Sequence, residues 1–218
     1  RLIKCIQSHC RAAKRPCVTW PREPVAEEGP IFRVGKNHRD VNSQAIMRSI
    51  NVNGFPAYPS KIVCVGRNYV AHIQELGNEI PGSMVVFNKP NSAITDILRS
   101  RIDNQVLHYE GELAFTVHHG KLAAVGFGLD LTKRALQSAL KEQSLPWERA
   151  KAFDGAALFS EFVALPKDIA SLSLRLDVDG ELRQAGGVDL MIYKPEAIIR
   201  ELATFTTLED GDIIMTGT

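Results

Sequence analysis

The chain has 218 residues, of which 44% are hydrophobic and 23% charged, as is usual for one globular domain or for a domain with an extension. The formal net charge of +1 excludes a strongly basic surface for nucleic acid or acidic lipid. No apolar run approaches the roughly 20 residues of a membrane-spanning helix. We therefore expect no nucleic-acid partner and no membrane partner.

The four cysteines do not resemble a secreted disulfide framework. Cys5, Cys10 and Cys17 fall near the start of the chain, whereas Cys64 lies in the apolar run KIVCVG and is expected to be a small buried side chain. This usage indicates a reducing compartment, and we predict a cytoplasmic protein. Zinc binding by the first three with His9 is disfavoured, because their spacing fits no standard zinc pattern.

The first 46 residues differ from the rest in composition and pattern. Six lysine and arginine residues precede the first acid, Glu23, and hydrophobic periodicity stays poor up to about Ile46. We expect residues 1–46 to be an N-terminal extension, disordered or spurious, ahead of a start near Met47. A basic, acid-poor beginning is also typical of an organelle presequence, so a mitochondrial location is the alternative.

Globular patterning begins near Tyr58. The run KIVCVG (61–66) predicts a strand that ends at a glycine turn, and NYVAHIQELG (68–77) predicts a short helix closed by Gly77. SMVVFNKP (83–90) predicts a second strand, which Pro90 stops.

Strands and helices alternate in the remainder of the chain. The expected elements are an acidic strand at 109–117, a small-residue strand at 122–130, a helix capped by Thr132, a hairpin with Asp179-Gly180 in its turn, a helix beginning at Pro195, and a final strand within 208–218. Because strands dominate and no repeat is visible, the pattern favours a β-rich α+β domain.

Three carboxylates stand out because they lie in apolar strands. Glu110 and Glu112 are two residues apart, so they share one face of a strand with Cα atoms about 6.7 Å apart. Asp130 ends the next apolar strand. Oxygen ligands of this kind suit a hard divalent cation. The alternative is that the glutamates lie on a solvated edge or pair with nearby bases, of which the candidates are Lys121, Lys133 and Arg134.

Two candidates lie near the predicted helix at 68–77. His72 and Glu75 are one helical turn apart, and a carboxylate beside an imidazole raises its basicity, so the pair could activate a water molecule. An ordinary exposed helix face would give the same spacing. Arg67 follows the strand end and could hold a substrate carboxylate or cap the helix.

Further candidates follow Asp130. Arg134 and Gln137 are one turn apart on the predicted helix, and with Asp130 they could present one polar surface. Lys151 lies between apolar residues, from which it could supply positive charge near a metal or extend to solvent.

Residues from about Tyr58 to Thr218 resemble the fumarylacetoacetate hydrolase family, in particular its small bacterial and mitochondrial acylpyruvase-like members. The matching motifs occur in order and are KIVCVGRNYVAHIQELG, VVFNKPNSAI, HYEGELAFTV, GFGLDLTKRALQ, LPWERAKAFDGAA, VDGELRQ and LEDGDIIMTGT. The resemblance implies that residues 58–218 form a mixed β-sandwich roll with a short lid helix. It also implies a homodimer.

The same resemblance assigns roles to the candidate residues. It implies Mg²⁺, with Mn²⁺ or Ca²⁺ possible, on Glu110, Glu112 and Asp130. The implied catalytic residues are His72 and Glu75 on the lid, and Lys151 beside the metal. The substrate-binding residues would be Arg67, Arg134, Gln137 and Thr218.

The implied activity is hydrolysis of a C–C bond in acylpyruvate-type 2-oxo acids, through an enolate that the cation stabilises. The alternatives are a decarboxylase or isomerase (tautomerase) that acts on oxaloacetate or a tricarboxylate, and an inactive metal-binding paralogue. Gly187 and Val188 stand where a Thr-Ser or Thr-Ala pair is usual in the family, so a hydroxyl that could contact the substrate or the lid is absent. The matched domain also looks truncated at Thr218, where relatives continue. The first departure favours the inactive alternative; the second favours it equally with a truncated gene model or a fragment.

Overall fold

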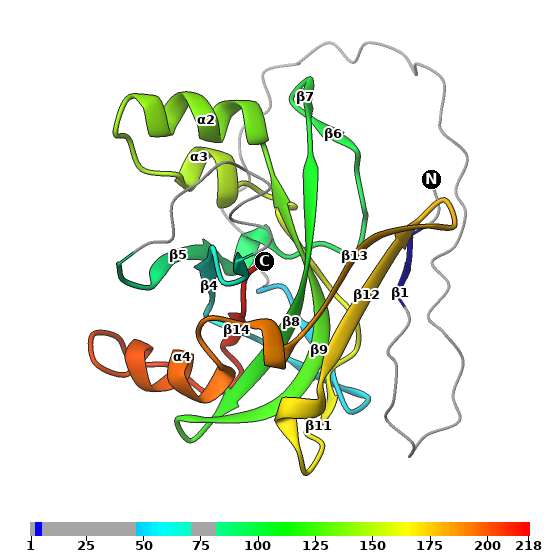
Figure 1. The fold of residues 1–218 in the computed structure, drawn as a ribbon, viewed down its shortest axis with the longest axis vertical. Helices are drawn as coiled ribbons and strands as arrows, with labels where there is room; N and C mark the ends of the chain where they lie inside the picture. The colour runs from blue at the N-terminus through cyan, green and yellow to red at the C-terminus, as the bar shows by residue number, and fades with distance from the viewer. Residues whose placement is uncertain (1–2, 6–46, 71–81) are drawn as a thin grey trace, which may run out of the picture.

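The computed structural model describes residues 3–5, 47–70 and 82–218. Its largest part is a curled, seven-stranded mixed sheet (Figure 1). Across this sheet the strands are β10 (Ala157–Phe159), β9 (Lys121–Thr132), β8 (His108–His118), β14 (Ile213–Met215), β4 (Lys61–Gly66) and β5 (Val85–Pro90), and β11 (Val163–Ala164) pairs with β9. Only the β14–β4 pair among these is parallel, which makes the sheet mixed.

A smaller sheet packs on the larger one. It contains β12 (Ser173–Val178) and β13 (Glu181–Gly187), with β1 (Ile3–Cys5) on the outer edge of β12. Asp179 and Gly180 join β12 to β13 with φ angles of 55° and 87°, the left-handed pair that a tight two-residue hairpin turn requires, as the sequence predicts. Two short ribbons complete the strands: β2 (Ile50–Val52) with β3 (Phe55–Ala57), and β6 (Arg101–Ile102) with β7 (Gln105–Val106).

Helices are few and short in the described residues. They are α2 (Arg134–Glu142), α3 (Glu148–Lys151), α4 (Pro195–Leu202) and the 3-10 turns η1 (Asn91–Ala93), η2 (Ile169–Ser171) and η3 (Val188–Leu190). The expectation of Pro195 at a helix start is confirmed. None of the helices described is long and apolar enough to cross a membrane.

The expectation that Thr132 caps α2 is wrong. Thr132 is still part of β9, where it pairs with His108, and Lys133 occupies the N-cap position without a side-chain cap. The Thr132 hydroxyl instead accepts a hydrogen bond from Lys151 Nζ at 2.6 Å. With this long-range contact, the extended backbone of β9 continues to Thr132, the position at which the local pattern predicts the helix cap.

Alternation along β8 separates two cores. Leu113 and Phe115 point to the face on which β12 packs, where they join Leu174 and Leu176. Ala114 points to the opposite face, into a second cluster with Cys64 and Met215 of the neighbouring strands. Helix α4 buries Ile198 and Leu202 against Val63, Val65 and Ile214 in a third cluster. The strand-rich α+β prediction is therefore confirmed.

Two predictions concern residues that lie wholly or partly outside the described ones. The predicted helix at 68–77 lies mostly outside the described residues. In the N-terminal extension only β1 is described, so the expectation for residues 1–46 stays a prediction. Cys64 is fully buried, as expected, and burial raises the pKa of its thiol.

Asp212 joins the starts of β4 and β14. Its Oδ1 accepts hydrogen bonds from the Ser60 amide at 2.9 Å and the Ser60 hydroxyl at 2.7 Å, while Oδ2 lies 2.6 Å from Lys61 Nζ. Burial alone would raise the pKa of Asp212, but the bonds from Lys61, Ser60 and the Glu209 amide outweigh it and lower the pKa. The ionised carboxylate therefore stabilises the fold.

Replacing Asp212 by asparagine should lower the free energy of unfolding by about 1.5–3 kcal/mol at neutral pH, the usual contribution of hydrogen bonds to a charged group. Since the folded pKa is lowered, this stability is present above about pH 4, the unfolded pKa of aspartate, and disappears as the pH falls through the folded value. Urea unfolding over that pH range measures it. Asp96→Asn, at an exposed position, is the matched control; equal losses in both variants would contradict the assignment.

Candidate metal and 2-oxo acid site

The three predicted carboxylates meet on one face of the β8–β9 pair. Glu110 lies directly opposite Asp130 in the antiparallel register, and Glu112 lies opposite Gly128. We call Glu110, Glu112 and Asp130 the carboxylate trio. One oxygen from each lies within 4.8 Å of the others, and the residues are 8%, 1% and 1% exposed. Because side chains alternate along a strand, the trio lies on the same sheet face as Ala114. This is the face that carries the hydrophobic cluster of Ala114, Cys64 and Met215.

Lys151, the last residue of α3, inserts its ammonium group between two members of the trio. Its Nζ lies 2.7 Å from Glu110 Oε2 and 2.6 Å from Asp130 Oδ2, and it also donates to Thr132 Oγ1. Burial alone would lower the pKa of Lys151, but the charges of Asp130 and Glu110 outweigh burial and raise it. Lys151 therefore stays positively charged at neutral pH and does not extend to solvent.

A second buried lysine, Lys89, was missed in the sequence. It is fully buried in β5, and its Nζ lies 2.8 Å from Asp130 Oδ1. It also donates to the backbone carbonyls of Leu131 and Lys151. Lys89 thus fixes Asp130 from one side and the end of α3 from another. The signal that could have found it is the one that singled out the glutamates, a charge within an apolar strand.

The first turn of α2 forms one rim of the site. Arg134 Nη1 donates to Gln137 Oε1 at 2.8 Å, and Arg134 Nη2 pairs with Glu110 Oε1. The structure thus brings Arg134 and Gln137 into contact with each other, and their role in substrate binding stays a prediction. Pairing of Glu110 with a nearby base, the alternative to a metal ligand, is also found, since Arg134 is that base.

The chain segment after β14 approaches the trio from the other side. The Gly217 amide donates to Glu112 Oε2 at 2.8 Å, and the Thr218 carbonyl accepts from the Asn68 amide at 3.0 Å. Gly217 has a φ of +87°, and a Cβ there would lie 2.5 Å from the Val65 carbonyl oxygen, so only glycine fits this approach. Thr218, 8% exposed, is therefore placed next to the residue that contacts Glu112.

The remaining predicted residues are less closely tied to the trio. Arg67 is half-buried with a φ of 58°; its charge is one of the influences, after burial, that lower the pKa of Lys141 on α2. The role of Arg67 in substrate binding stays a prediction. His72 and Glu75 lie outside the described residues, so their catalytic role stays a prediction.

The donor set of the trio fits a hard divalent cation. The two lysines contact Asp130 and Glu110, whereas the hydrogen bond described for the Glu112 carboxylate comes from an uncharged amide. Burial, and then the charges of Asp130 and Glu110, raise the pKa of Glu112 well above its ordinary value. A divalent cation beside Glu112 would stabilise its ionised form, and Mg²⁺, Mn²⁺ and Ca²⁺ all prefer such oxygen ligands. The trio is therefore a candidate metal site.

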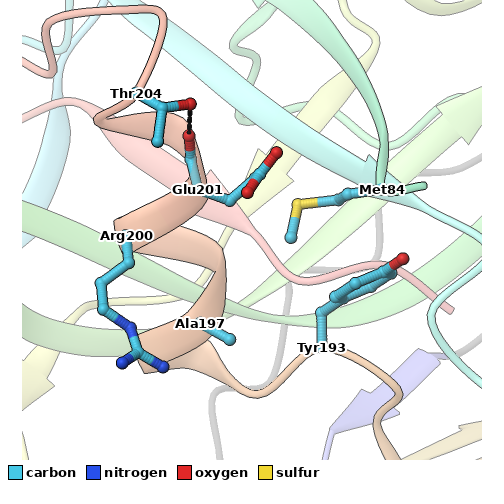
Figure 2. A pocket seen from close by; sticks show the side chains of 6 residues that line it. All are labelled: Met84, Tyr193, Ala197, Arg200, Glu201 and Thr204. Carbon is cyan, nitrogen blue, oxygen red and sulfur yellow. Dashed lines mark hydrogen bonds between the residues drawn. The ribbon is translucent and has the colours of Figure 1, made fainter.

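A separate pocket of about 360 Å³ lies on α4. Figure 2 shows its lining, which consists of Met84, Tyr193, Ala197, Arg200, Glu201 and Thr204. None of the predicted site residues lines it. Its hydrogen bond from Thr204 Oγ1 to the Glu201 carbonyl satisfies the end of the helix rather than presenting a polar group to a ligand.

Known proteins match both the sequence and the fold of this chain. The family model for the fumarylacetoacetate (FAA) hydrolase C-terminal region matches residues 61–218. An oxaloacetate tautomerase of Escherichia coli K12 is 40% identical, with 74% of this chain and 82% of the relative covered. A mitochondrial oxaloacetate decarboxylase of Dictyostelium discoideum is 34% identical, with 77% and 84% covered. The crystal structure of a Pseudomonas aeruginosa fumarylpyruvate hydrolase with Mn²⁺ and pyruvate superposes with a TM-score of 0.75 at 27% identity, covering 84% of this chain and 87% of that one.

Proposed function

Because the chain belongs to the fumarylacetoacetate hydrolase family, we propose that it is a divalent-metal-dependent tautomerase that interconverts the keto and enol forms of oxaloacetate or a similar 2-oxo acid. The observation that carries the proposal is the position of Lys151, a permanently charged ammonium group held against two carboxylates of an oxygen-only candidate metal site. The names of the tautomerase and decarboxylase relatives support the choice of substrate.

The charged and polar residues of the site would have different roles in this reaction. A metal on the trio would supply Lewis-acid stabilisation of negative charge on the substrate oxygens. Lys151 adds a fixed positive charge beside those oxygens, which favours the enolate without any need for reorganisation. Arg134 and Gln137 would supply donors for a second substrate carboxylate, in place of the hydrogen bond that joins the two side chains. His72, with Glu75, would carry the proton to and from C3.

Hydrolysis of an acylpyruvate is the second candidate. It adds one water across the C–C bond and releases pyruvate and a carboxylic acid. The pyruvate and Mn²⁺ in the fumarylpyruvate hydrolase structure favour it, as does a His72–Glu75 pair that could activate the water. Both reactions pass through negative charge on the same substrate oxygens, so Lys151 serves either one.

The test is an assay of the full chain on both substrates. With Mg²⁺ or Mn²⁺, enol oxaloacetate should convert to the keto form faster than without enzyme, and the acceleration should disappear in EDTA and return with metal. Acetylpyruvate should be cleaved more slowly than oxaloacetate tautomerises. Faster acetylpyruvate cleavage would favour the hydrolase, and metal binding without either reaction would favour the inactive paralogue.

Location and assembly remain proposals of the same kind. The Dictyostelium relative carries the word mitochondrial in its name, which supports the mitochondrial alternative for the basic N-terminus over the cytoplasmic prediction. We further propose a homodimer, as the family resemblance implies. Sedimentation of the full chain measures this, and a monomer at assay concentration would contradict it.

A further inference from the structure

A second group of metal-ligating side chains lies at the tip of the β8–β9 hairpin. His118 ends β8, His119 follows in the turn, and Asp210 lies in the turn before β14. One ligand atom from each lies within 4.8 Å of the others. We call His118, His119 and Asp210 the imidazole–carboxylate cluster. The hairpin tip is at the end of the sheet opposite α2 and α3 (Figure 1).

The turn itself brings the two imidazoles together. Neighbouring side chains on a regular strand point to opposite faces, which would separate His118 from His119. His119 instead has a φ of 48°, the left-handed conformation that histidine adopts more readily than most residues. The two ring centroids are consequently 4.0 Å apart.

Hydrogen bonds to its side chain and to the neighbouring backbone hold Asp210 against these rings. The His119 amide donates to Asp210 Oδ1 at 2.7 Å, which leaves Oδ2 at 2.7 Å from His118 Nδ1 and 3.8 Å from His119 Nδ1. The backbone on either side is fixed to β8, because the Gly211 amide donates to the Val117 carbonyl at 2.8 Å and the Val117 amide donates to the Asp212 carbonyl at 2.9 Å. The ligand atoms are thus positioned by the fold before any ion arrives.

We propose that the imidazole–carboxylate cluster binds one borderline divalent transition-metal ion, such as Zn²⁺, Ni²⁺ or Cu²⁺, through both Nδ1 atoms and Asp210 Oδ2. Two imidazole nitrogens and one carboxylate oxygen are the donors of many three-residue zinc sites, and they differ in kind from the oxygen-only trio. The side chains are 60%, 81% and 49% exposed, so water completes the coordination. The ion replaces the hydrogen bond between His118 and Asp210.

This site is independent of the proposed enzyme activity. Glu112 and His118 are six positions apart in β8, a distance of about 20 Å along the strand. Loss of metal here should therefore leave the carboxylate trio intact.

Cu²⁺ titration of the full chain, followed by electron paramagnetic resonance with excess Mg²⁺ present, tests the proposal. Wild type should bind a Cu²⁺ with two nitrogen ligands. His118→Ala and His119→Ala should each lose one nitrogen coupling and at least about 10-fold in affinity, since even a supporting contact to a metal ligand is worth 10–100-fold. His108→Ala, at an exposed histidine near the other end of β8, is the control and should bind as wild type does.

A second readout separates loss of binding from loss of folding. Cu²⁺ should raise the melting temperature of wild type and His108→Ala, while His118→Ala/His119→Ala should keep the metal-free melting temperature and show no rise. The same nitrogen count and affinity in the double variant would place the ion elsewhere and overturn the proposal. Absence of saturable Cu²⁺ binding by wild type would overturn it as well, and would leave the cluster as an ion pair that stabilises the hairpin.

Discussion

Lys151→Met is expected to lower the free energy of unfolding by about 3–5 kcal/mol in EDTA, the usual cost of removing one partner of a buried ion pair. The reason is that Glu110 and Asp130 would keep their charges in the interior without the ammonium group that lies 2.7 and 2.6 Å from them. The same change should lower kcat by about 10²–10³-fold, the range found when one preorganised donor to a developing oxyanion is removed.

Urea unfolding and the oxaloacetate assay measure these two effects. Mg²⁺ should restore part of the stability of Lys151→Met, because the ion stabilises the carboxylates that the lysine left, but should not restore kcat. Lys133→Met is the matched control, since Lys133 is also a buried lysine but its partner Asp103 is exposed and stays hydrated when the lysine is removed. Similar losses in both variants, or an active Lys151→Met, would contradict the role given to Lys151.

Glu112→Gln is expected to weaken metal binding strongly without lowering the free energy of unfolding of the metal-free protein. It removes one of three ligand carboxylates, so Mg²⁺ or Mn²⁺ affinity should fall more than about 100-fold, beyond the effect of losing a contact to a ligand. In EDTA the variant should be at least as stable as wild type, because a buried carboxylate with a raised pKa costs stability once it is ionised.

The pH dependence of the metal-free stability tests whether the ionised Glu112 carboxylate destabilises the fold. A raised folded pKa means that metal-free wild type loses stability as the pH rises from about 4.3, the unfolded pKa of glutamate, towards the folded value. Glu112→Gln should remove that loss, whereas Glu142→Gln, at an exposed position on α2, should retain it. A metal-free Glu112→Gln protein less stable than wild type at neutral pH would show that the carboxylate is stabilised by its neighbours and has no need of a cation.

Local pattern was sufficient for most strands and for placing Glu110 and Glu112 on one strand face. The alternation that places Glu110 and Glu112 on one face depends only on strand geometry, and Asp179-Gly180 supplies the left-handed backbone that its turn requires. These features are determined by neighbours in the chain, which is why they can be found in a single sequence.

Contacts between distant segments account for what was missed. Lys89 reaches Asp130 across 41 positions, and nothing in VVFNKP indicates which acid it meets. Thr132 has the composition of a helix cap, but its hydroxyl is used by Lys151 from a four-residue helix too short to show periodicity. The parallel pairing of β14 with β4 likewise depends on packing and not on either strand alone.

The most direct test of the central claim, that Glu110, Glu112 and Asp130 together hold one divalent cation, is a crystal structure grown with Mn²⁺ and measured at the manganese absorption edge. We expect a single anomalous peak bonded to one carboxylate oxygen from each of the three residues, with Lys151 still in contact with Glu110 or Asp130. A peak that contacts none of the three, or Mn²⁺ found only at His118, His119 and Asp210, would contradict the account.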